Sequence, residues 1–252
     1  WLPQLLALVP EPYRGQLALR LLGLSPHYFI YQWTDRYPDA MPRPAILEAE
    51  HRRNKQSRQA LFEHVLRPHV APGMTVMDFG CGPGYLAYAT AQHVKRVVAV
   101  DISPGALACA RVLNGRENID YVQNEERSIR AVDDASVDLI YSFAVVQHMR
   151  DEAVKAITRE WLRTLKSGGQ LVCHVALRSE AAPASANASD DDAQGFDLRS
   201  RYALRMRYRT KDALRALLRR SGFENVTFAF FDGLEEIDDD VAREPLVLAS
   251  KP

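Results

Sequence analysis

The sequence predicts an α/β fold in which helices connect the strands of a buried parallel sheet. From Thr75 onward, short runs rich in β-branched residues alternate with longer segments of helical character, which is the pattern of repeated strand–helix–strand units. These runs are apolar over most of their length, as strands covered on both faces are. Their sequences are TVMDFG, RVVAVD, IDYVQ, VDLIYS and QLVCHVAL.

Composition and charge narrow the class of protein. The 252 residues are 47% hydrophobic and 25% charged, which is typical of a globular domain. Thirty-two basic residues balance thirty-two acidic ones, so we expect no nucleic-acid partner. Because no apolar run approaches the roughly 18 residues of a membrane helix, we also expect no membrane span.

The three cysteines, Cys81, Cys109 and Cys173, are odd in number and widely spaced. None belongs to a C-x-x-C pair of the kind that zinc and redox sites use. We therefore expect reduced thiols and a cytoplasmic location. Residues 1–10 are interrupted by two prolines and lack the basic start of a signal peptide, which agrees with that expectation.

The region before the first strand is predicted to form a helical N-terminal cap. An irregular, proline-rich start with an aromatic patch, SPHYFIYQWTDRYP, precedes residues 44–69, whose composition favours one or two helices. Apolar residues of this segment are Ile46, Leu47, Leu61, Phe62, Val65 and Leu66. We therefore divide the chain into a cap over residues 1–70 and a sheet domain over residues 71–252.

Boundary signals predict three helices within the sheet domain. Ser103, which precedes Pro104, and Thr210 are each expected to cap the start of a helix, and glycines are expected to end all three. The helices are predicted over residues 104–114, 151–166 and 211–221, before Gly115, Gly168 and Gly222. Two further apolar runs, VTFAFF and PLVLAS, predict a pair of strands at the C-terminus.

A small, polar and acidic stretch interrupts this order after the fifth run. Residues 178–200 contain EAAPASANASDDDAQG, which is too poor in apolar residues to build a core, so we predict a mobile insertion over residues 178–208. The basic run RSRYALRMRYRTK follows. It favours either a solvated face or a lid strand that offers arginines between Arg205 and Arg209 to an anionic or polyhydroxylated ligand.

The stretch VMDFGCGPG, residues 76–84, is the most informative motif. A strand ends near Asp78 and is followed by three glycines, Gly80, Gly82 and Gly84, in the turn before a helix. Without side chains, such a turn lets the backbone approach a ligand closely. Asp101 ends the next strand, 21 residues after Gly80, where an acidic side chain can accept hydrogen bonds from a ribose diol.

The turn has the spacing G-x-G-x-G and not the G-x-G-x-x-G of dinucleotide folds. A pyrophosphate needs a free helix N-terminus, whereas this turn carries Pro83 and follows the acidic Asp78, which repels phosphate and suits a cationic ligand. Asp78 could also be a plain turn residue at the end of a strand. Asp101 could simply cap the helix that follows it.

In these motifs and their order, the chain resembles a class I S-adenosylmethionine-dependent methyltransferase of the group that modifies small molecules. VMDFGCGPG is similar to the first motif of that superfamily, VVAVDIS to the second, VDLIYSFAVVQHM to the strand-four motif and LKSGGQLV to the segment that enters strand five. The resemblance spans residues 61–223. It implies a Rossmann-like, seven-stranded, mostly parallel sheet with helices on both faces and an antiparallel last strand, and S-adenosylmethionine as the cofactor.

The resemblance also implies site residues. Asp101 and Ile102 would hold the ribose and flank the adenine, and the first motif would line the methionine part of the cofactor. Where the superfamily has an acid beside the adenine, this chain has Asn124 followed by Glu125, and either can make the contact. The remaining residues that the resemblance assigns to the cofactor are Asp78, Gly80, Cys81, Gly82, Gly84, Ser142 and Phe143.

The stretch SFAVVQHMRD places His148 just beyond the end of the fourth strand. An imidazole there would face the space in front of the transferred methyl group and could remove a proton from an attacking hydroxyl. It could equally hydrogen-bond the backbone of the loop and take no part in the chemistry. His148 is the predicted catalytic residue, and His51 in EAEHRRNKQ is a weaker rival.

We therefore expect methyl transfer from S-adenosylmethionine to a small-molecule acceptor. An oxygen acceptor is favoured because His148 offers deprotonation, and the acceptor is expected to be a sugar, lipid-linked or aromatic hydroxyl that is anionic or polyhydroxylated. The cap and the insertion are the segments expected to bind it. The alternatives are a nitrogen acceptor, a non-catalytic S-adenosylmethionine-binding module and an NAD-dependent oxidoreductase. A magnesium-assisted reaction would need Asp190, Asp191 and Asp192, but their surroundings favour a solvated run, so we expect no metal.

Overall fold

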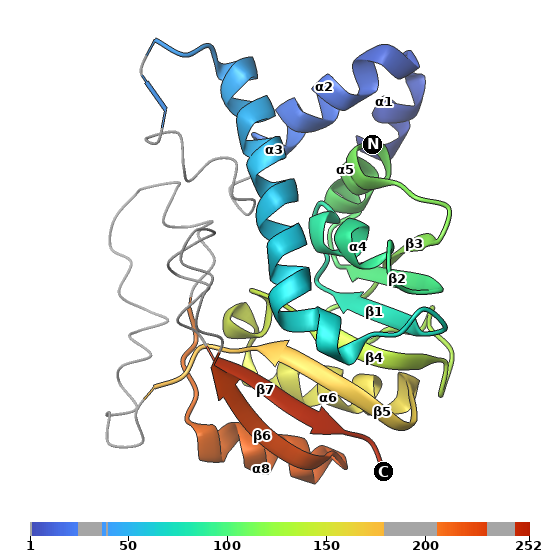
Figure 1. Cartoon of the computed structure of the whole chain (residues 1–252), viewed down its shortest axis with the longest axis vertical. Coiled ribbons are helices and arrows are strands. Elements are labelled where there is room, and N and C mark those ends of the chain that lie inside the picture. The colour runs from blue at the N-terminus through green and yellow to red at the C-terminus, as the bar shows by residue number, and fades with distance from the viewer. Residues whose placement is uncertain (1, 25–36, 39, 179–205, 231–244) are drawn as a thin grey trace.

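One seven-stranded sheet, in the order β3-β2-β1-β4-β5-β7-β6, runs through the computed structural model (Figure 1). The structure describes residues 2–24, 37, 38, 40–178, 206–230 and 245–252. Strand β7 is antiparallel to both of its neighbours, and the other adjacent pairs are parallel, which confirms the predicted fold class. The strands are β1 (Thr75–Phe79), β2 (Arg96–Asp101), β3 (Ile119–Gln123), β4 (Val137–Ser142), β5 (Leu165–His174), β6 (Glu224–Phe230) and β7 (Pro245–Ser250).

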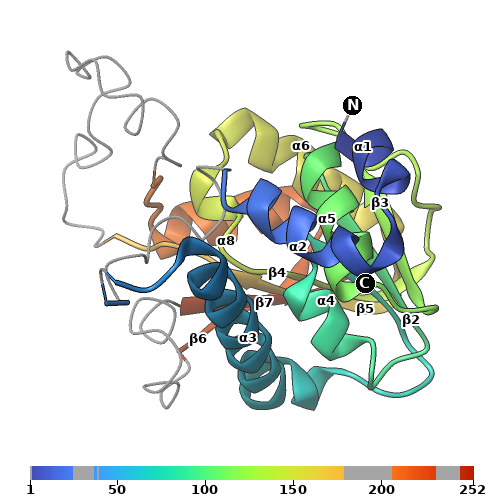
Figure 2. The ribbon, with the colours of Figure 1, turned by 90° about the horizontal axis from the view of Figure 1, so that it is seen from above.

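Helices cover both faces of the sheet, as Figure 2 shows for α3 and α4 on one side and α6 and α8 on the other. Strand side chains alternate between the faces, so Val76 of β1 joins one apolar core and Met77 and Phe79 join the other. Trp161 of α6 packs edge-on against Phe79, with 5.2 Å between the ring centroids. The helices between the strands are α4 (Tyr85–Thr90), α5 (Pro104–Asn114), α6 (Asp151–Thr164) and α8 (Lys211–Ser221).

Among the described residues, three helices precede the sheet, and the first two correct our expectation of an irregular start. They are α1 (Leu2–Leu8), α2 (Glu11–Leu22) and α3 (Arg43–Leu61), which continues into short π-helical and 3-10 turns (Phe62–Leu66 and Arg67–His69). Pro10 and Pro12 stand at the start of α2, where a missing N–H costs no hydrogen bond, so they begin a helix instead of breaking one. The division of the chain at residue 70 stays a prediction.

The capping signals at Ser103 and Thr210 are confirmed. Each hydroxyl accepts a hydrogen bond of 3.2 Å from the backbone N–H three residues further on. The predicted extension of the middle helix to residue 166 is wrong, because α6 ends at Thr164 and β5 begins at once by pairing Leu165 with Val137. The glycines expected to end that helix lie inside β5 instead, where its pairing with β4 is irregular.

Four further predictions concern the cysteines, a membrane span, the insertion after β5 and the location of the protein. Cys81, Cys109 and Cys173 are buried free thiols, and within the described ranges no helix is long and apolar enough to cross a membrane. Most of the predicted insertion, with its three consecutive aspartates, lies outside the described residues, and so does the aromatic stretch YFIYQW. The cytoplasmic location stays a prediction.

Candidate functional site

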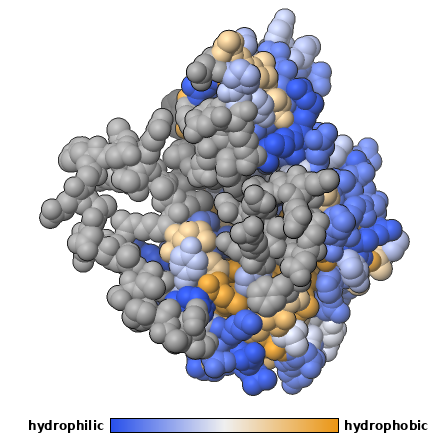
Figure 3. All heavy atoms as spheres, turned by 60° about the vertical axis from the view of Figure 1, so that its left-hand side comes forward, coloured by the Kyte–Doolittle hydropathy of each residue, from blue (hydrophilic) through white to orange (hydrophobic). Residues whose placement is uncertain are grey.

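A cavity of about 570 Å³ lies at the edge of the sheet where β1, β2 and β4 end. Figure 3 shows the side of the molecule toward which the parallel strands run, with apolar side chains in view among hydrophilic ones. Gly84, Glu125 and Ser142 are absent from the lining of this cavity among the described residues. The predicted site residues that do line it are Asp78, Gly80, Cys81, Gly82, Asp101, Ile102, Asn124, Phe143 and His148.

Two of the glycines need a left-handed backbone and the absence of a side chain. Gly80 has φ +78°, and a Cβ there would lie 2.2 Å from Cγ2 of Val145, in the loop after β4. Gly84 has φ +79°, and a Cβ there would lie 2.3 Å from the hydroxyl oxygen of Tyr121 on β3. Gly80 therefore lets the turn lie against the loop after β4, whereas Gly84 shapes the start of α4 without lining the cavity.

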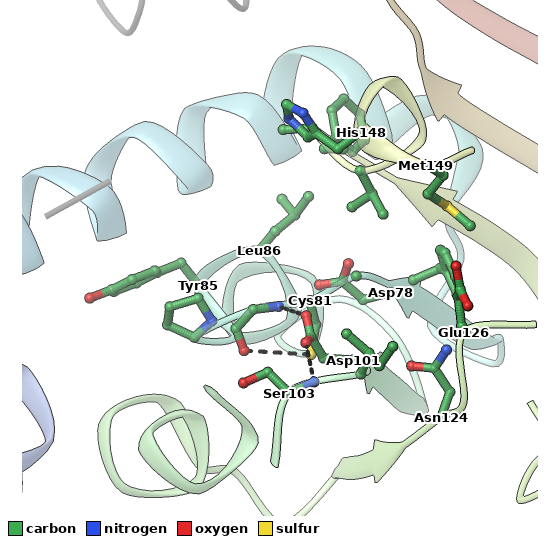
Figure 4. A pocket seen from close by; sticks show the side chains of 18 of the residues that line it. Asp78, Cys81, Tyr85, Leu86, Asp101, Ser103, Asn124, Glu126, His148 and Met149 are labelled. Atoms are coloured by element: carbon green, nitrogen blue, oxygen red, sulfur yellow. Dashed lines mark hydrogen bonds between the residues drawn. The ribbon is translucent and has the colours of Figure 1, made fainter. Parts of the chain in front are cut away.

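Asp101 ties the glycine turn to the segment that follows β2. Its Oδ2 accepts a hydrogen bond from the Gly82 N–H and its Oδ1 one from the Ser103 N–H, both at 2.8 Å (Figure 4). Burial raises the pKa of this carboxyl, and hydrogen bonds from the backbone oppose the rise. Ser103 also caps α5. Asp101 therefore lies in the cavity wall and connects the glycine turn to the start of that helix.

Asp78 is a buried acid with an unsatisfied oxygen. Burial above all, and then the negative charge of Asp101, raise the pKa of Asp78 to about 8, although the Ala87 N–H and the charge of Arg58 act in the opposite direction. Its Oδ2 is buried and has no hydrogen-bond partner among the described residues. Leaving a buried oxygen without a partner costs free energy in the folded state. A cationic ligand beside Asp78 would pair with this oxygen and favour the ionised carboxylate.

In the segment after β3, Asn124 lies in the cavity wall and Glu125 does not. Asn124 lines the cavity, and its backbone N–H donates to the carbonyl of Asp101 at 3.1 Å. Glu125 exchanges backbone hydrogen bonds with Ser128 and does not line the cavity. Glu126 does line it, although the sequence reasoning missed this residue. Of the two candidates that the motif left open, Asn124 is the one in position to contact a ligand.

Of the two predicted site residues at the end of β4, one lies inside the sheet and the other lines the cavity. Ser142 is fully buried, and its hydroxyl donates to the carbonyl of Phe79 at 2.9 Å, so it joins β4 to β1 inside the sheet. Phe143 lines the cavity. Ile102, after β2, is 55% exposed and adds an apolar surface to the wall.

His148 ends the 3-10 turn Val146–His148, between β4 and α6, and lines the cavity. The backbone of the turn makes its own hydrogen bonds, from His148 N–H to the Val145 carbonyl at 2.9 Å and from Met149 N–H to the Val146 carbonyl at 3.2 Å. Figure 4 shows His148 and Met149 across the cavity from Asp101 and Ser103. His148 and Asp101 therefore lie on opposite sides of the same cavity.

Two arginines of the predicted lid occupy different places. The Arg209 guanidinium donates to the carbonyls of Val146 and Met149, at 3.0 and 2.7 Å, and pairs with the Asp151 carboxylate at 2.8 Å. It therefore holds both ends of the turn that carries His148. Arg207 lines the cavity, and its backbone N–H donates to the Gln147 carbonyl at 2.6 Å. Arg205 lies outside the described residues.

Helix α3 contributes Asn54 and Arg58 to the cavity wall, and the sequence reasoning missed both. Asn54 is 5% exposed, and its side-chain amide donates to the Glu50 carbonyl at 2.8 Å. Glu50, Asn54 and Ser57 are buried polar residues spaced four and three apart, so they form a polar stripe on a covered helix face. That spacing is the signal that could have indicated a functional face.

His51 lies one side chain away from the cavity. Its Nδ1 is 2.8 Å from the hydroxyl oxygen of Tyr85, which lines the wall. Burial, together with the charges of Lys55 and Arg52, lowers the pKa of His51 to about 4. An imidazole with so low a pKa is a poor proton acceptor near neutral pH, so His51 is the weaker candidate base.

The cavity fits the cofactor that the sequence resemblance implies. S-adenosylmethionine carries sulfonium and ammonium cations, a ribose diol and an adenine ring. Asp78 offers a buried oxygen that has no partner within the described part of the chain, and Asp101 offers a carboxylate beside the glycine turn. Ile102 and Asn124 supply an apolar and an amide surface for a ring. Each of these groups of the cofactor thus has a matching residue type in the wall.

Comparison with known proteins gives a family match that contains most of the residues lining the cavity. Residues 77–173 match a family model described as a methyltransferase domain. The ubiquinone biosynthesis O-methyltransferase of Xanthomonas campestris pv. campestris is 32% identical over 123 residues, 48% of this chain and 51% of that protein. A probable S-adenosylmethionine-dependent methyltransferase of Mycolicibacterium smegmatis is 30% identical over 115 residues, 46% of this chain and 43% of that protein. The chain spans about half the length of the curated relatives it matches.

The fold has a counterpart among solved structures. An S-adenosylmethionine-dependent methyltransferase from Mesorhizobium loti matches with a TM-score of 0.56 and 22% identity, over 74% of this chain and 95% of that one. The family match includes Asp78, the glycine turn, Asp101 and His148, and with them most of the residues that line the cavity. The family match over residues 77–173 identifies a methyltransferase domain of the class I S-adenosylmethionine-dependent superfamily, whose cofactor is S-adenosylmethionine.

Proposed function

We propose that this chain transfers the methyl group of S-adenosylmethionine to an oxygen atom of a small molecule, with His148 as the general base. The observation that carries the proposal is the placement of His148 in the wall of the cavity that also contains Asp78 and Asp101, and across it from Asp101 (Figure 4). Bound S-adenosylmethionine supplies a methyl group on a positively charged sulfur, which a nucleophile can displace in line.

Different residues in the cavity wall bind the cofactor, exclude water and accept the proton. Asp78 and Asp101 bind and orient the cofactor, and Phe143 and Met149 add apolar surface that excludes water from the reacting atoms. As the acceptor oxygen bonds to the methyl carbon and the bond from that carbon to sulfur breaks, His148 takes the hydroxyl proton. Alignment provides most of the rate enhancement, and a positioned base contributes roughly 10²–10⁴-fold.

An oxygen acceptor is favoured by the imidazole and by the relative from Xanthomonas campestris, whose name describes an O-methyltransferase. Arg150 and Arg207 lie in the cavity wall beside His148 and Met149. Guanidinium groups bind carboxylates, phosphates and hydroxyl groups well. We therefore propose an acceptor that carries a sugar, lipid-linked or aromatic hydroxyl together with an acidic group or further hydroxyls.

Calorimetric titration with S-adenosylmethionine, followed by assay of S-adenosylhomocysteine release, tests the proposal. We expect binding of S-adenosylmethionine, no binding of NAD, and release of S-adenosylhomocysteine with at least one member of a panel of phenols, catechols and sugar acids. Turnover with amines alone would contradict the oxygen acceptor. Cofactor binding without turnover on hydroxyl or amine acceptors would instead support a non-catalytic module.

A further inference from the structure

We infer that His174 is a positioning residue for this reaction, because its imidazole fixes the loop of residues 143–150 that carries His148. The inference rests on the proposed function, which gives the position of His148 a catalytic consequence. His174 is the last residue of β5, which pairs with β4 at Ser142 and Cys173. It is 2% exposed and does not line the cavity within the described residues, so any influence on the acceptor acts through the loop.

Three residues of the loop converge on the His174 ring. The Ala144 backbone N–H donates to Nδ1 at 3.2 Å, and the side-chain Nε2 of Gln147 lies 3.5 Å from the same atom. The ring of Phe143 is nearly parallel to the imidazole, at 11° and 6.1 Å between centroids. Since a backbone N–H can only donate, Nδ1 must be the acceptor, and the proton of the neutral ring must be on Nε2.

The loop needs such a support because Ala144 has a left-handed backbone, with φ +58°. A residue with a Cβ rarely adopts this conformation, and it persists where the surroundings hold it in place. The hydrogen bond to His174 is made by the N–H of this same residue. Without an acceptor at position 174, Ala144 can relax toward an ordinary backbone conformation and redirect the turn that follows.

The turn is thus held at two places by residues from other parts of the chain. His174 fixes the entrance to the loop at Ala144, and Arg209 holds the two ends of the turn that follows through the carbonyls of Val146 and Met149. His148 lies between these supports and lines the cavity. The place of its imidazole therefore depends on the Nδ1 atom of His174.

The variants His174→Asn and His174→Leu test this inference because they have similar shapes and differ in the acceptor. The Asn Oδ1, like the His Nδ1, is one bond beyond Cγ and can accept from Ala144. We expect His174→Leu to lower kcat about tenfold, as expected for one lost buried hydrogen bond, and to leave the Kd for S-adenosylmethionine nearly unchanged. His174→Asn should keep most of the wild-type kcat.

His93 offers a matched control. Its ring stacks on Phe62 at 4.5 Å between centroids, and it precedes β2, at the end of the sheet opposite to the cavity. His93→Leu therefore removes a similar aromatic contact far from the loop, and we expect it to leave kcat unchanged. A loss of kcat in His174→Asn as large as in His174→Leu would overturn the inference.

Nuclear magnetic resonance of protein labelled with ¹⁵N-histidine tests the inference without turnover. We expect an unprotonated Nδ1 and a protonated Nε2 for His174 in the wild type, and ring signals of His148 that move in His174→Leu but not in His174→Asn. A proton on Nδ1, or His148 signals that ignore both substitutions, would overturn it. Failure of the proposed function would look different, since the wild type would then release no S-adenosylhomocysteine while these signals stayed as expected.

Discussion

The two sides of the cavity have different origins in the sequence. On the proposed cofactor side, Asp78 lies near the end of β1 and Asp101 ends the adjacent β2, and the Asp101 carboxylate accepts a hydrogen bond from Gly82 of the short glycine turn. On the acceptor side, Arg58, His148 and Arg207 come from a helix, a loop and a segment far apart in the chain. The first side follows from local sequence and sheet topology, whereas the second depends on tertiary packing.

The largest effect on cofactor binding is expected where the two sides touch, at Gly80. The change Gly80→Ala forces a Cβ against Val145 and strains a backbone with φ +78°. We expect it to lower the free energy of unfolding by about 3 kcal/mol and the affinity for S-adenosylmethionine by roughly 100-fold. Chemical denaturation and calorimetry would measure the two effects.

Gly73→Ala is the matched control, because Gly73 has no atom within 4 Å of an added Cβ. It should change neither quantity. Adding Val145→Ala to Gly80→Ala should recover part of the lost affinity, since it removes the atoms that clash. Equal effects at Gly80 and Gly73 would show that the glycine turn does not depend on the loop after β4.

On the cofactor side, Asp101→Ala is expected to have the next largest effect. It removes the acceptor for two backbone N–H groups, at 2.8 Å each, together with the proposed ribose contact. Because hydrogen bonds to charged groups contribute about 1.5–3 kcal/mol each, the Kd for S-adenosylmethionine should rise roughly 30-fold to 100-fold. A calorimetric Kd within about twofold of the wild-type value would remove Asp101 from the cofactor site.

Asp78 should make cofactor binding depend on pH. Its pKa of about 8, raised mainly by burial, means that the free protein holds the carboxyl largely neutral below that pH. A bound cation favours the carboxylate, so binding releases a proton, and the Kd should fall by up to about tenfold per pH unit as the pH rises toward 8. Above pH 8 the Kd should level off.

The same shift should affect stability in the opposite direction. The carboxyl ionises near pH 3.8 in the unfolded chain but near 8 in the folded one, so its contribution to stability is lost as the pH rises through that range. Calorimetry and thermal unfolding at several pH values would measure both slopes, and Asp78→Asn should flatten them. Slopes that persist in Asp78→Asn would assign the titration to another group.

The smallest effect is expected on the acceptor side, at Arg209. The change Arg209→Lys keeps the charge near Asp151 but cannot reach the carbonyls of Val146 and Met149 at the same time. We expect kcat to fall roughly fivefold with little change in the Kd for S-adenosylmethionine. Arg215→Lys, which alters an ion pair with Asp212 on the surface of α8, is the control and should leave kcat unchanged.

The same division explains what could be predicted from the sequence. The alternation of strands and helices along the chain and the helix caps at Ser103 and Thr210 were predictable, because periodicity and capping are local properties of the sequence. Helices α1 and α2 were missed because prolines were taken as breakers, although Pro12 stands in a first turn. The end of α6 was missed because tertiary pairing of Leu165 with β4 outweighed the helical pattern.

Within the site, the cofactor residues follow from a motif, but the supports of His148 do not. Nothing local to His174 or Arg209 indicates that they bond to a loop about 30 and 60 residues away in the chain. For Asn54 and Arg58 the sequence offers only the spacing of polar residues along α3, which does not by itself tell which face of the helix is covered. Such residues become visible only when the packing is known.

The comparison of His148→Ala with His64→Ala tests the central claim most directly. His64 is an exposed histidine on the turn after α3 and does not line the cavity, so its variant controls for the loss of an imidazole. At saturating cofactor and acceptor, we expect His148→Ala to lower kcat by roughly 10²–10⁴-fold, with the Kd for S-adenosylmethionine within about twofold of wild type. A kcat equal to that of His64→Ala would contradict a catalytic role for His148.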